Sequence, residues 1–244
     1  MRTPIVWQLV TVDAVVPETA HAKTIVLETP AWPGHLAGQH VDVRLTAQDG
    51  YQAQRSYSVA SAPEDRRLAL TIERIDDGEV SPYLTDELRQ GDQFELRGPV
   101  GGHFTWSVDR GGPLLLLAGG SGLVPLMAML RHRRAQHSTV DARLLVSARS
   151  WEDVLYGDEL SSLAAGEGLE VAYTLTRSQP SGWTGWSRRV DAEMLAALGP
   201  AVAQQPLVFV CGPTPFVEQA ADLLVELGHQ PGAIHAERFG PTGV

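Results

Sequence analysis

Four side chains able to hold a flat, phosphate-bearing ligand lie in one stretch of the first quarter of the chain, Arg55-Ser56-Tyr57-Ser58. The Arg55 guanidinium can pair with phosphate through its planar fork, and the Tyr57 ring can lie against another ring. The Ser58 hydroxyl can donate to or accept from a ring nitrogen. Side chains alternate here with a period of two, which predicts a strand. An exposed barrel strand with a surface arginine would give the same pattern, so both interpretations stay open.

A second candidate phosphate contact follows at Gly78-Glu79-Val80-Ser81. Ser81 is a favoured N-cap and Pro82 suits the first helical position, so the sequence predicts a short helix over Ser81–Leu88. The free N–H groups at the start of a helix can meet a phosphate. An ordinary capped connecting helix is the alternative.

A glycine-rich loop in the second half, Gly119-Gly120-Ser121-Gly122, opens an apolar helical segment that contains Pro125. Glycines let a dinucleotide approach the backbone, and a helix start faces its phosphates. The spacing differs from Gly-x-Gly-x-x-Gly, so the generic Rossmann pattern does not apply. A glycine-rich connection without a ligand is the alternative.

Several cations follow the next predicted strands. Ser147 and Arg149 end one strand, where a hydroxyl and a guanidinium can recognise an adenosine ribose and its 2′-phosphate. Arg149 could instead pair with Glu152 or Asp153. Three more arginines come later, and the sequence does not decide which of them contacts a nucleotide: Arg177, Arg188 and Arg189.

The elements that must position these residues change in type at about residue 110. Short strands separated by turns predict a six-stranded antiparallel barrel over residues 1–110. These strands are Trp7–Val16, Thr24–Glu28, His40–Leu45, Ser56–Ala60, Leu68–Ile75 and Gln93–Leu96. Over residues 111–244, apolar runs alternate with helix-period segments, which predicts a five-stranded parallel sheet covered by helices on both faces. The expected strands here are Leu114–Ala118, Ala142–Ser147, Val171–Leu175, Leu207–Cys211 and Ile234–Glu237, and the expected helices are Leu123–Arg134, Val154–Leu163, Ala192–Leu198 and Phe216–Leu227. Ligands of such sheets bind at the carboxyl ends of the strands.

Taken in order, the motifs resemble those of the ferredoxin–NADP reductase superfamily. Arg55-Ser56-Tyr57-Ser58 is similar to its flavin-binding signature Arg-x-Tyr-Ser. Six further stretches resemble its motifs in the family's order, namely Gly78–Ser81, Gly98–Gly101, Gly119–Pro125, Trp183–Val190, Cys211–Pro213 and Glu237–Gly240. One departure is Arg188, which stands where relatives commonly have a second glycine. The resemblance covers nearly the whole chain.

The resemblance implies a flavin held by the barrel domain, residues 1–110, and a nicotinamide nucleotide held by the α/β domain, residues 111–244. It implies catalytic roles for Ser58, Cys211 and Glu237, with the Cys211 thiol near the nicotinamide. The implied flavin-binding residues are Arg55, Ser56, Tyr57, Ser58, Gly78, Val80, Ser81 and Phe239. The implied nucleotide-binding residues are Gly119, Gly120, Ser121, Gly122, Pro125, Ser147, Arg149, Arg177, Arg189, Cys211, Gly212 and Pro213. No metal is implied.

The family's activity would then be hydride transfer from NAD(P)H to bound FAD, followed by single-electron transfer to a separate ferredoxin-like carrier. FAD is favoured over FMN because the turn at Gly78–Ser81 fits a pyrophosphate. NADPH is slightly favoured over NADH because no acidic residue stands at the end of the second strand, where Arg149 is available for a 2′-phosphate. Three alternatives remain: a reductase of free flavin, ferric chelates or quinones; an electron-transfer subunit of a larger complex; and a non-enzymatic flavin or nucleotide sensor.

Composition limits the rest. The 244 residues, 43% of them hydrophobic, suffice for two domains with proper cores. A net charge of −10 argues against nucleic acid and anionic membranes as partners. The single cysteine, Cys211, excludes an internal disulfide and a cluster held by four cysteines, so the expected acceptor is a separate molecule. No apolar run reaches bilayer length, and Met1–Ile5 lack a signal-peptide core, so a cytoplasmic location is expected.

Overall fold

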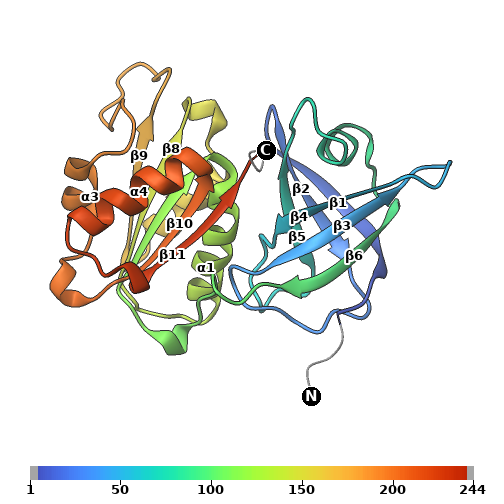
Figure 1. Cartoon of the computed structure of the whole chain (residues 1–244), viewed down its shortest axis with the longest axis horizontal. Helices are drawn as coiled ribbons and strands as arrows, with labels where there is room; N and C mark the ends of the chain where they lie inside the picture. The colour runs from blue at the N-terminus through green and yellow to red at the C-terminus, as the bar shows by residue number, and fades with distance from the viewer. Residues whose placement is uncertain (1–4, 241–244) are drawn as a thin grey trace.

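The computed structural model describes residues 5–240, so Met1–Pro4, part of the stretch used for the signal-peptide expectation, lie outside it. The chain forms two bodies side by side, an antiparallel barrel and a parallel sheet with helices (Figure 1). The barrel sheet has the strand order β4-β3-β6-β1-β2-β5. Its strands are β1 (Gln8–Thr19), β2 (Ala22–Glu28), β3 (His40–Thr46), β4 (Gln52–Ser58), β5 (Leu68–Glu73) and β6 (Gln93–Val100). The predicted six-stranded antiparallel sheet is confirmed.

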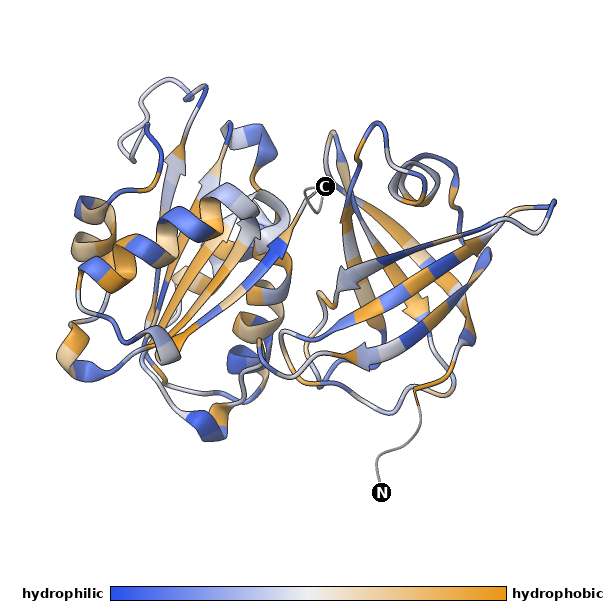
Figure 2. Cartoon of the chain, in the orientation of Figure 1, coloured by the Kyte–Doolittle hydropathy of each residue, from blue (hydrophilic) through white to orange (hydrophobic). Residues whose placement is uncertain are grey.

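The barrel closes where the end of β4 meets β5. Val59 forms an isolated antiparallel bridge to Leu70, and the Ala60 N–H donates to the Ala69 carbonyl at 2.8 Å. The barrel core is made of the inward side chains of its strands, which are apolar and buried. Figure 2 shows hydrophobic and hydrophilic positions intermixed along these strands. Because side chains alternate along a strand, the same strands leave a polar outer face, to which Ser56 of β4 belongs. Arg55 shares the opposite face of β4 with Ala53 and Tyr57, and it is itself exposed.

A short helix follows β5 and contributes Leu84 to the barrel core. Its main part, η1 (Tyr83–Glu87), is a π-helix, and the two residues before it, Ser81 and Pro82, are α-helical. The predicted helix is present, but the predicted Ser81 cap is wrong. The Ser81 hydroxyl instead accepts the N–H of Ile75 at 3.1 Å, which ties the loop to the end of β5.

The second sheet is parallel, with the strand order β11-β10-β7-β8-β9, and this prediction is also confirmed. Its strands are β7 (Leu114–Gly119), β8 (Ala142–Ala148), β9 (Leu169–Leu175), β10 (Leu207–Pro213) and β11 (Ile234–Phe239). Its α-helices are α1 (Leu123–Ala135), α2 (Gly157–Ala164), α3 (Ala192–Leu198) and α4 (Thr214–Glu226). Short 3-10 turns are η2 (Val108–Arg110), η3 (Gly120–Gly122), η4 (Trp151–Asp153), η5 (Val202–Gln204) and η6 (Pro231–Ala233). No helix within residues 5–240 is long and apolar enough to cross a membrane.

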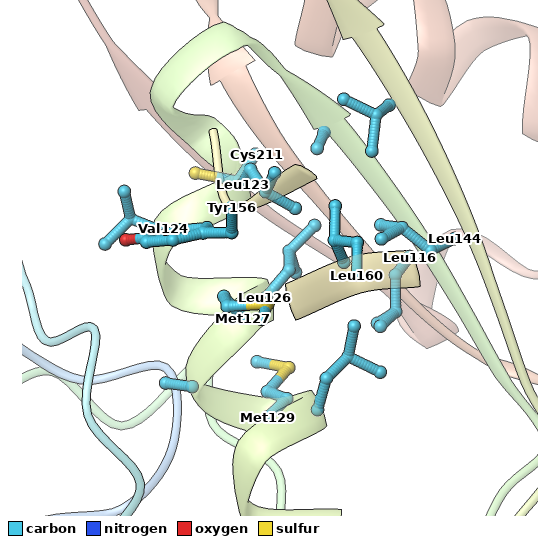
Figure 3. Packing of buried hydrophobic residues seen from close by; sticks show 14 of the residues in the cluster. Leu116, Leu123, Val124, Leu126, Met127, Met129, Leu144, Tyr156, Leu160 and Cys211 are labelled. Atoms are coloured by element: carbon cyan, nitrogen blue, oxygen red, sulfur yellow. The ribbon is translucent and has the colours of Figure 1, made fainter. Parts of the chain in front are cut away.

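The two faces of the parallel sheet carry separate cores. Leu114 and Leu116 of β7 pack with α1 and α2, whereas Leu115 and Leu117 pack with α3 and α4. This alternation buries every residue of β7 and explains why the strand is continuously apolar. Figure 3 shows the first of these cores, with Leu116 and Leu144 of the sheet and Leu123, Met127 and Met129 of α1.

Helix α1 separates the parallel sheet from the barrel (Figure 1). Its apolar side chains share one core cluster with Ala37 and Ala60 of the barrel. Arg131 of α1 donates to the Ala60 carbonyl at 2.6 Å, and His132 contacts the Glu64 carboxylate at 2.7 Å. The interface between the two bodies is therefore both apolar and hydrogen-bonded.

Candidate functional site

Strand β4 carries exposed polar side chains on both of its faces, with Gln54 and Ser56 on one face and Arg55 on the other. Arg55 lies there with its guanidinium about half exposed, 2.9 Å from the Glu79 carboxylate. Glu79 also accepts the Tyr51 hydroxyl at 2.6 Å. These contacts bring Arg55 and the Gly78–Ser81 loop together, as the sequence predicted, although the sequence analysis did not foresee the Glu79 pair.

The other polar side chains of β4 differ in their surroundings. The Ser56 hydroxyl donates to the buried Asp42 carboxylate of β3 at 2.6 Å. Asp42 also accepts a hydrogen bond from Arg97 at 2.9 Å, so the Ser56 hydroxyl is held toward β3. Tyr57 packs its ring against the barrel core, and this burial raises the pKa of its phenol. Ser58, half-buried, ends the strand opposite His40.

The Gly78–Ser81 loop is mostly buried or hydrogen-bonded. Val80 is fully buried, so its side chain belongs to the barrel core. A Cβ at Gly78 would come within 3.0 Å of both the Ile75 carbonyl and the Ser81 hydroxyl, which favours glycine there. The Ser81 hydroxyl already bonds Ile75, and the Gly78 N–H donates to the Ile75 carbonyl at 2.9 Å, so the exposed part of this loop is Glu79.

Two glycines of the loop after β7 are required for different reasons. A Cβ on Gly122 would clash with the Cys211 backbone, so this glycine lets the loop press against β10. Gly120 has φ +53°, which favours glycine, and nothing lies within 4 Å of its absent Cβ. Pro125 is buried inside α1. Gly120 therefore faces open space, while Gly122 and Pro125 shape the turn.

A cleft of about 340 Å³ lies between the barrel and the carboxyl edge of the parallel sheet. Its sheet-side wall includes many of the residues predicted for the nucleotide, namely Gly119, Gly120, Ser121, Ser147, Arg149 and Pro213, together with Phe239. Its barrel-side wall was missed by sequence reasoning and consists of Thr19, His21, Ala22, Glu73, Arg74 and Asp76. These residues come from the β1–β2 turn and the end of β5, and no local motif marks them.

The arginines near this edge fall into two groups. Arg149 is exposed at the cleft wall, and within residues 5–240 it forms no ion pair with Glu152 or Asp153. The N–H of Arg177 bonds the Arg149 carbonyl at 2.9 Å, which places the two residues together. Arg188, by contrast, is paired with carboxylates of its own segment, Asp191 at 2.6 Å and Glu193 at 2.7 Å. Arg189 is exposed.

Cys211 and Glu237 are direct neighbours in the β10–β11 pairing. Cys211 is 2% exposed and lies in the core cluster of α1 beside Leu123 (Figure 3). Burial, reinforced by the Glu237 charge, raises the pKa of the Cys211 thiol, so the thiol stays protonated at neutral pH. Burial also raises the pKa of Glu237 to about 7. At the end of β11, Phe239 pairs with Pro213 and is partly exposed in the cleft.

Comparisons with known proteins follow the same division of the chain. Residues 8–106 match the oxidoreductase FAD-binding domain family, and residues 116–222 match the oxidoreductase NAD-binding domain family. Ferredoxin–NADP reductase B of Sorangium cellulosum is 35% identical over 210 residues, which cover 83% of this chain and 84% of that protein. The chain belongs to the ferredoxin–NADP reductase superfamily.

The chain is also similar to a longer relative and to a solved structure of about its own length. The glycine betaine monooxygenase reductase subunit of Pseudomonas aeruginosa is 32% identical over 210 residues, covering 84% of this chain and 56% of that protein. The chain therefore spans little more than half the length of that relative. The fold matches the flavohem-like FAD/NAD binding domain of nitric oxide dioxygenase from Vibrio cholerae, with a TM-score of 0.86 at 24% identity, covering 96% of this chain and 98% of that one.

The two candidate sites fit the cofactors that these domain families are named for. On the barrel, the half-exposed Arg55 side chain and the neighbouring Gly78–Ser81 loop suit a flavin phosphate. At the sheet edge, a glycine turn, a hydroxyl and an arginine border a cleft, as a nicotinamide nucleotide requires.

Proposed function

We propose that this chain is a flavin-dependent NAD(P)H oxidoreductase that takes hydride from NAD(P)H onto bound FAD and passes single electrons to a separate ferredoxin-like carrier. The observation that carries the proposal is the cleft between the two bodies. Its sheet-side wall holds the glycine loop and Arg149, and its other wall is formed by barrel residues such as His21 and Arg74. The proposed flavin residues Arg55, Tyr57 and Ser58 belong to the same barrel, on β4, but do not line this cleft.

FAD, when bound, supplies the ring that accepts hydride and releases electrons singly. On the barrel, Arg55 and the Gly78–Ser81 loop would hold its pyrophosphate, and Tyr57 and Ser58 would hold the ring. A groove of about 430 Å³ continues from this point and is lined by Tyr51, Ala53 and Phe94. The groove supports FAD over FMN, because it offers an amphipathic surface for an adenosine next to the phosphate contacts.

The nicotinamide nucleotide would lie along the carboxyl edge of the parallel sheet. Gly119, Gly120 and Ser121 would meet its phosphates, and Ser147 and Arg149 its adenosine ribose. The unpaired Arg149 guanidinium at the cleft wall, with Arg177 beside it, supports NADPH over NADH as the donor.

The protein's part in the reaction is to position, to exclude water and to hold protons in place. The Cys211 thiol is uncharged and buried, so it would shape the nicotinamide end of the cleft without acting as a base. Glu237, with its pKa raised to about 7, can be protonated near neutral pH. No protein acid or base is required for the hydride step itself, so Ser58, Cys211 and Glu237 act by position and charge.

A separate ferredoxin-like carrier is proposed as the acceptor, and the similarity to a ferredoxin–NADP reductase supports it. The similarity to a monooxygenase reductase subunit supports an oxygenase system as the downstream user. We also propose the boundary between the barrel and α/β domains near residue 110, after β6 and before β7.

The acceptor is tested by steady-state turnover of the FAD-loaded protein. NADPH or NADH would be oxidised with a plant-type [2Fe–2S] ferredoxin, free FMN, ferric citrate or a quinone as acceptor. The proposal predicts that the ferredoxin is reduced with the highest kcat/KM. Faster reduction of a small acceptor, with no gain from ferredoxin, would replace the proposal with a flavin, ferric or quinone reductase.

A further inference from the structure

The Glu79 carboxylate joins two residues of the barrel surface with its two oxygens. One oxygen accepts Arg55 Nη2 at 2.9 Å, and the other accepts the Tyr51 hydroxyl at 2.6 Å. The second terminal nitrogen of Arg55 donates to the Gln54 carbonyl at 2.7 Å. Both ends of the Arg55 fork are therefore engaged by groups of the chain itself.

A carboxylate and a phosphate compete for the same face of a guanidinium, because both present paired oxygens to its planar fork. Glu79 also lies between the Gly78 and Ser81 positions of the loop proposed to meet the pyrophosphate. A negative charge fixed at this point repels a phosphate even if the two share Arg55.

We propose that Glu79 is an internal competitor for Arg55 that lowers the affinity of the barrel for FAD. This inference rests on the proposed function and deepens it, since it assigns to Glu79 the control of flavin occupancy. The position of Tyr51 supports the assignment. Its hydroxyl holds Glu79 toward Arg55, and both Tyr51 and Glu79 line the adjoining groove.

The expected size of the effect follows from exposure. The side chains of Arg55 and Glu79 are 53% and 47% exposed, and ion pairs of this kind change an equilibrium by about two- to fivefold. Direct repulsion between Glu79 and the pyrophosphate acts in the same direction. Replacing the carboxylate by an amide should therefore tighten FAD binding by about three- to tenfold.

The opposite role is also chemically reasonable, and the same variant separates the two. If Glu79 served to orient Arg55 and Tyr51 for the flavin, its removal would loosen the guanidinium and weaken FAD binding. The sign of the change in the dissociation constant therefore decides the question.

The experiment compares Glu79→Gln with Glu87→Gln in the full chain. Glu87 is an exposed acid at the end of η1 and takes part in no ion pair within residues 5–240, so its variant changes the net charge equally without touching Arg55. Flavin is stripped from each protein, and FAD is titrated back while flavin fluorescence is followed, at low and at high salt. Riboflavin, which has no phosphate, serves as a second probe, and the thermal shift caused by FAD gives a second measure of affinity.

We expect Glu79→Gln to bind FAD at least threefold tighter than Glu87→Gln. High salt should reduce this difference in dissociation constant. For riboflavin, the two variants should have equal dissociation constants. Equal or weaker FAD binding by Glu79→Gln overturns the inference, as does an equal difference with riboflavin. If the unsubstituted chain binds no FAD, the proposed function fails as well. If it binds FAD and the two variants agree, only the role of Glu79 fails.

Discussion

The Tyr156 hydroxyl donates to the Thr71 hydroxyl, and this bond crosses from the α/β body to β5 of the barrel. Tyr156 is 5% exposed and adopts a left-handed conformation at the start of α2, with φ 56°. Thr71 is bonded in turn to Thr24 at 2.7 Å, and the Arg131 guanidinium lies over the Tyr156 ring. A buried polar chain thus fixes the distance between the two walls of the cleft, since Ala22 and Leu155 beside it line that cleft.

Removing this hydroxyl should weaken the joint between the two bodies. Tyr156→Phe keeps the ring but loses the cross-interface bond, while Thr71 keeps its bond to Thr24. We expect a loss of about 1 kcal/mol in the free energy of unfolding, measured by denaturant titration. Tyr83→Phe, at a partly exposed position, is the control and should change stability by less than about 0.5 kcal/mol. Equal stability of the two variants would show that the bond contributes nothing.

The raised pKa of Glu237 makes folding stability depend on pH. Burial holds this carboxyl protonated up to about pH 7 in the folded chain, whereas it ionises near 4.5 when unfolded. The folded state therefore binds the extra proton between these values, so the contribution of Glu237 to stability falls as the pH rises from about 4.5 to 7.

Glu237→Gln removes this titration. As the pH is raised from 5 to 8, the stability of the variant relative to that of the unsubstituted chain should rise by about 2 kcal/mol. Denaturant titrations of both proteins at several pH values measure the difference. A difference that stays constant with pH would mean that the carboxyl titrates normally.

Cys211 should be chemically inert in the folded protein. Its thiol is buried and kept protonated, so an aromatic disulfide reagent at pH 7.5 should label it at least about 100-fold more slowly than in the unfolded chain. Rapid labelling of the native protein would contradict the buried position of Cys211 in the core beside α1.

Ser58 and Cys211 are expected to influence the rate of hydride transfer more than cofactor binding. Ser58→Ala and Cys211→Ala should be purified with FAD bound, yet nucleotide should reduce the flavin about tenfold or more slowly. Ser162→Ala, on the exposed side of α2, should behave like the unsubstituted chain. A Ser58→Ala protein that is purified without flavin would show that Ser58 holds the cofactor instead.

Arg149 should set the choice between the two nucleotides. A guanidinium facing a 2′-phosphate contributes a charge-assisted pair, so Arg149→Ala should lower kcat/KM for NADPH about tenfold and leave that for NADH within about twofold. Arg134→Ala, at an exposed position near the end of α1, controls for the lost charge. Equal losses with both nucleotides would remove Arg149 from the 2′-phosphate.

Most of the fold could be predicted from the sequence because the pattern of apolar residues along a strand depends on which of its faces are buried. Leu114–Leu117 are continuously apolar since both faces of β7 are covered, and burial alternates along β6, with Phe94 and Leu96 buried, since one face of that strand is exposed. The glycine loop and Arg149 could also be placed, because parallel strands bring their carboxyl ends to one edge.

What the sequence could not predict depends on long-range contacts. The pairing of Glu79 with Arg55 joins residues 24 positions apart, and His21 and Arg74 reach the cleft only because β2 and β5 are neighbours in the barrel. Ser81 has the sequence context of an N-cap, but the end of β5 passes close enough to take its hydroxyl.

The central claim, that this chain transfers hydride from a nicotinamide nucleotide to its own flavin, is tested most directly by anaerobic stopped-flow absorbance. The FAD-loaded protein is mixed with NADPH and separately with NADH, and the flavin band is followed. The account predicts rapid bleaching, faster with NADPH. A protein that binds no flavin, or whose flavin neither nucleotide bleaches, would contradict it.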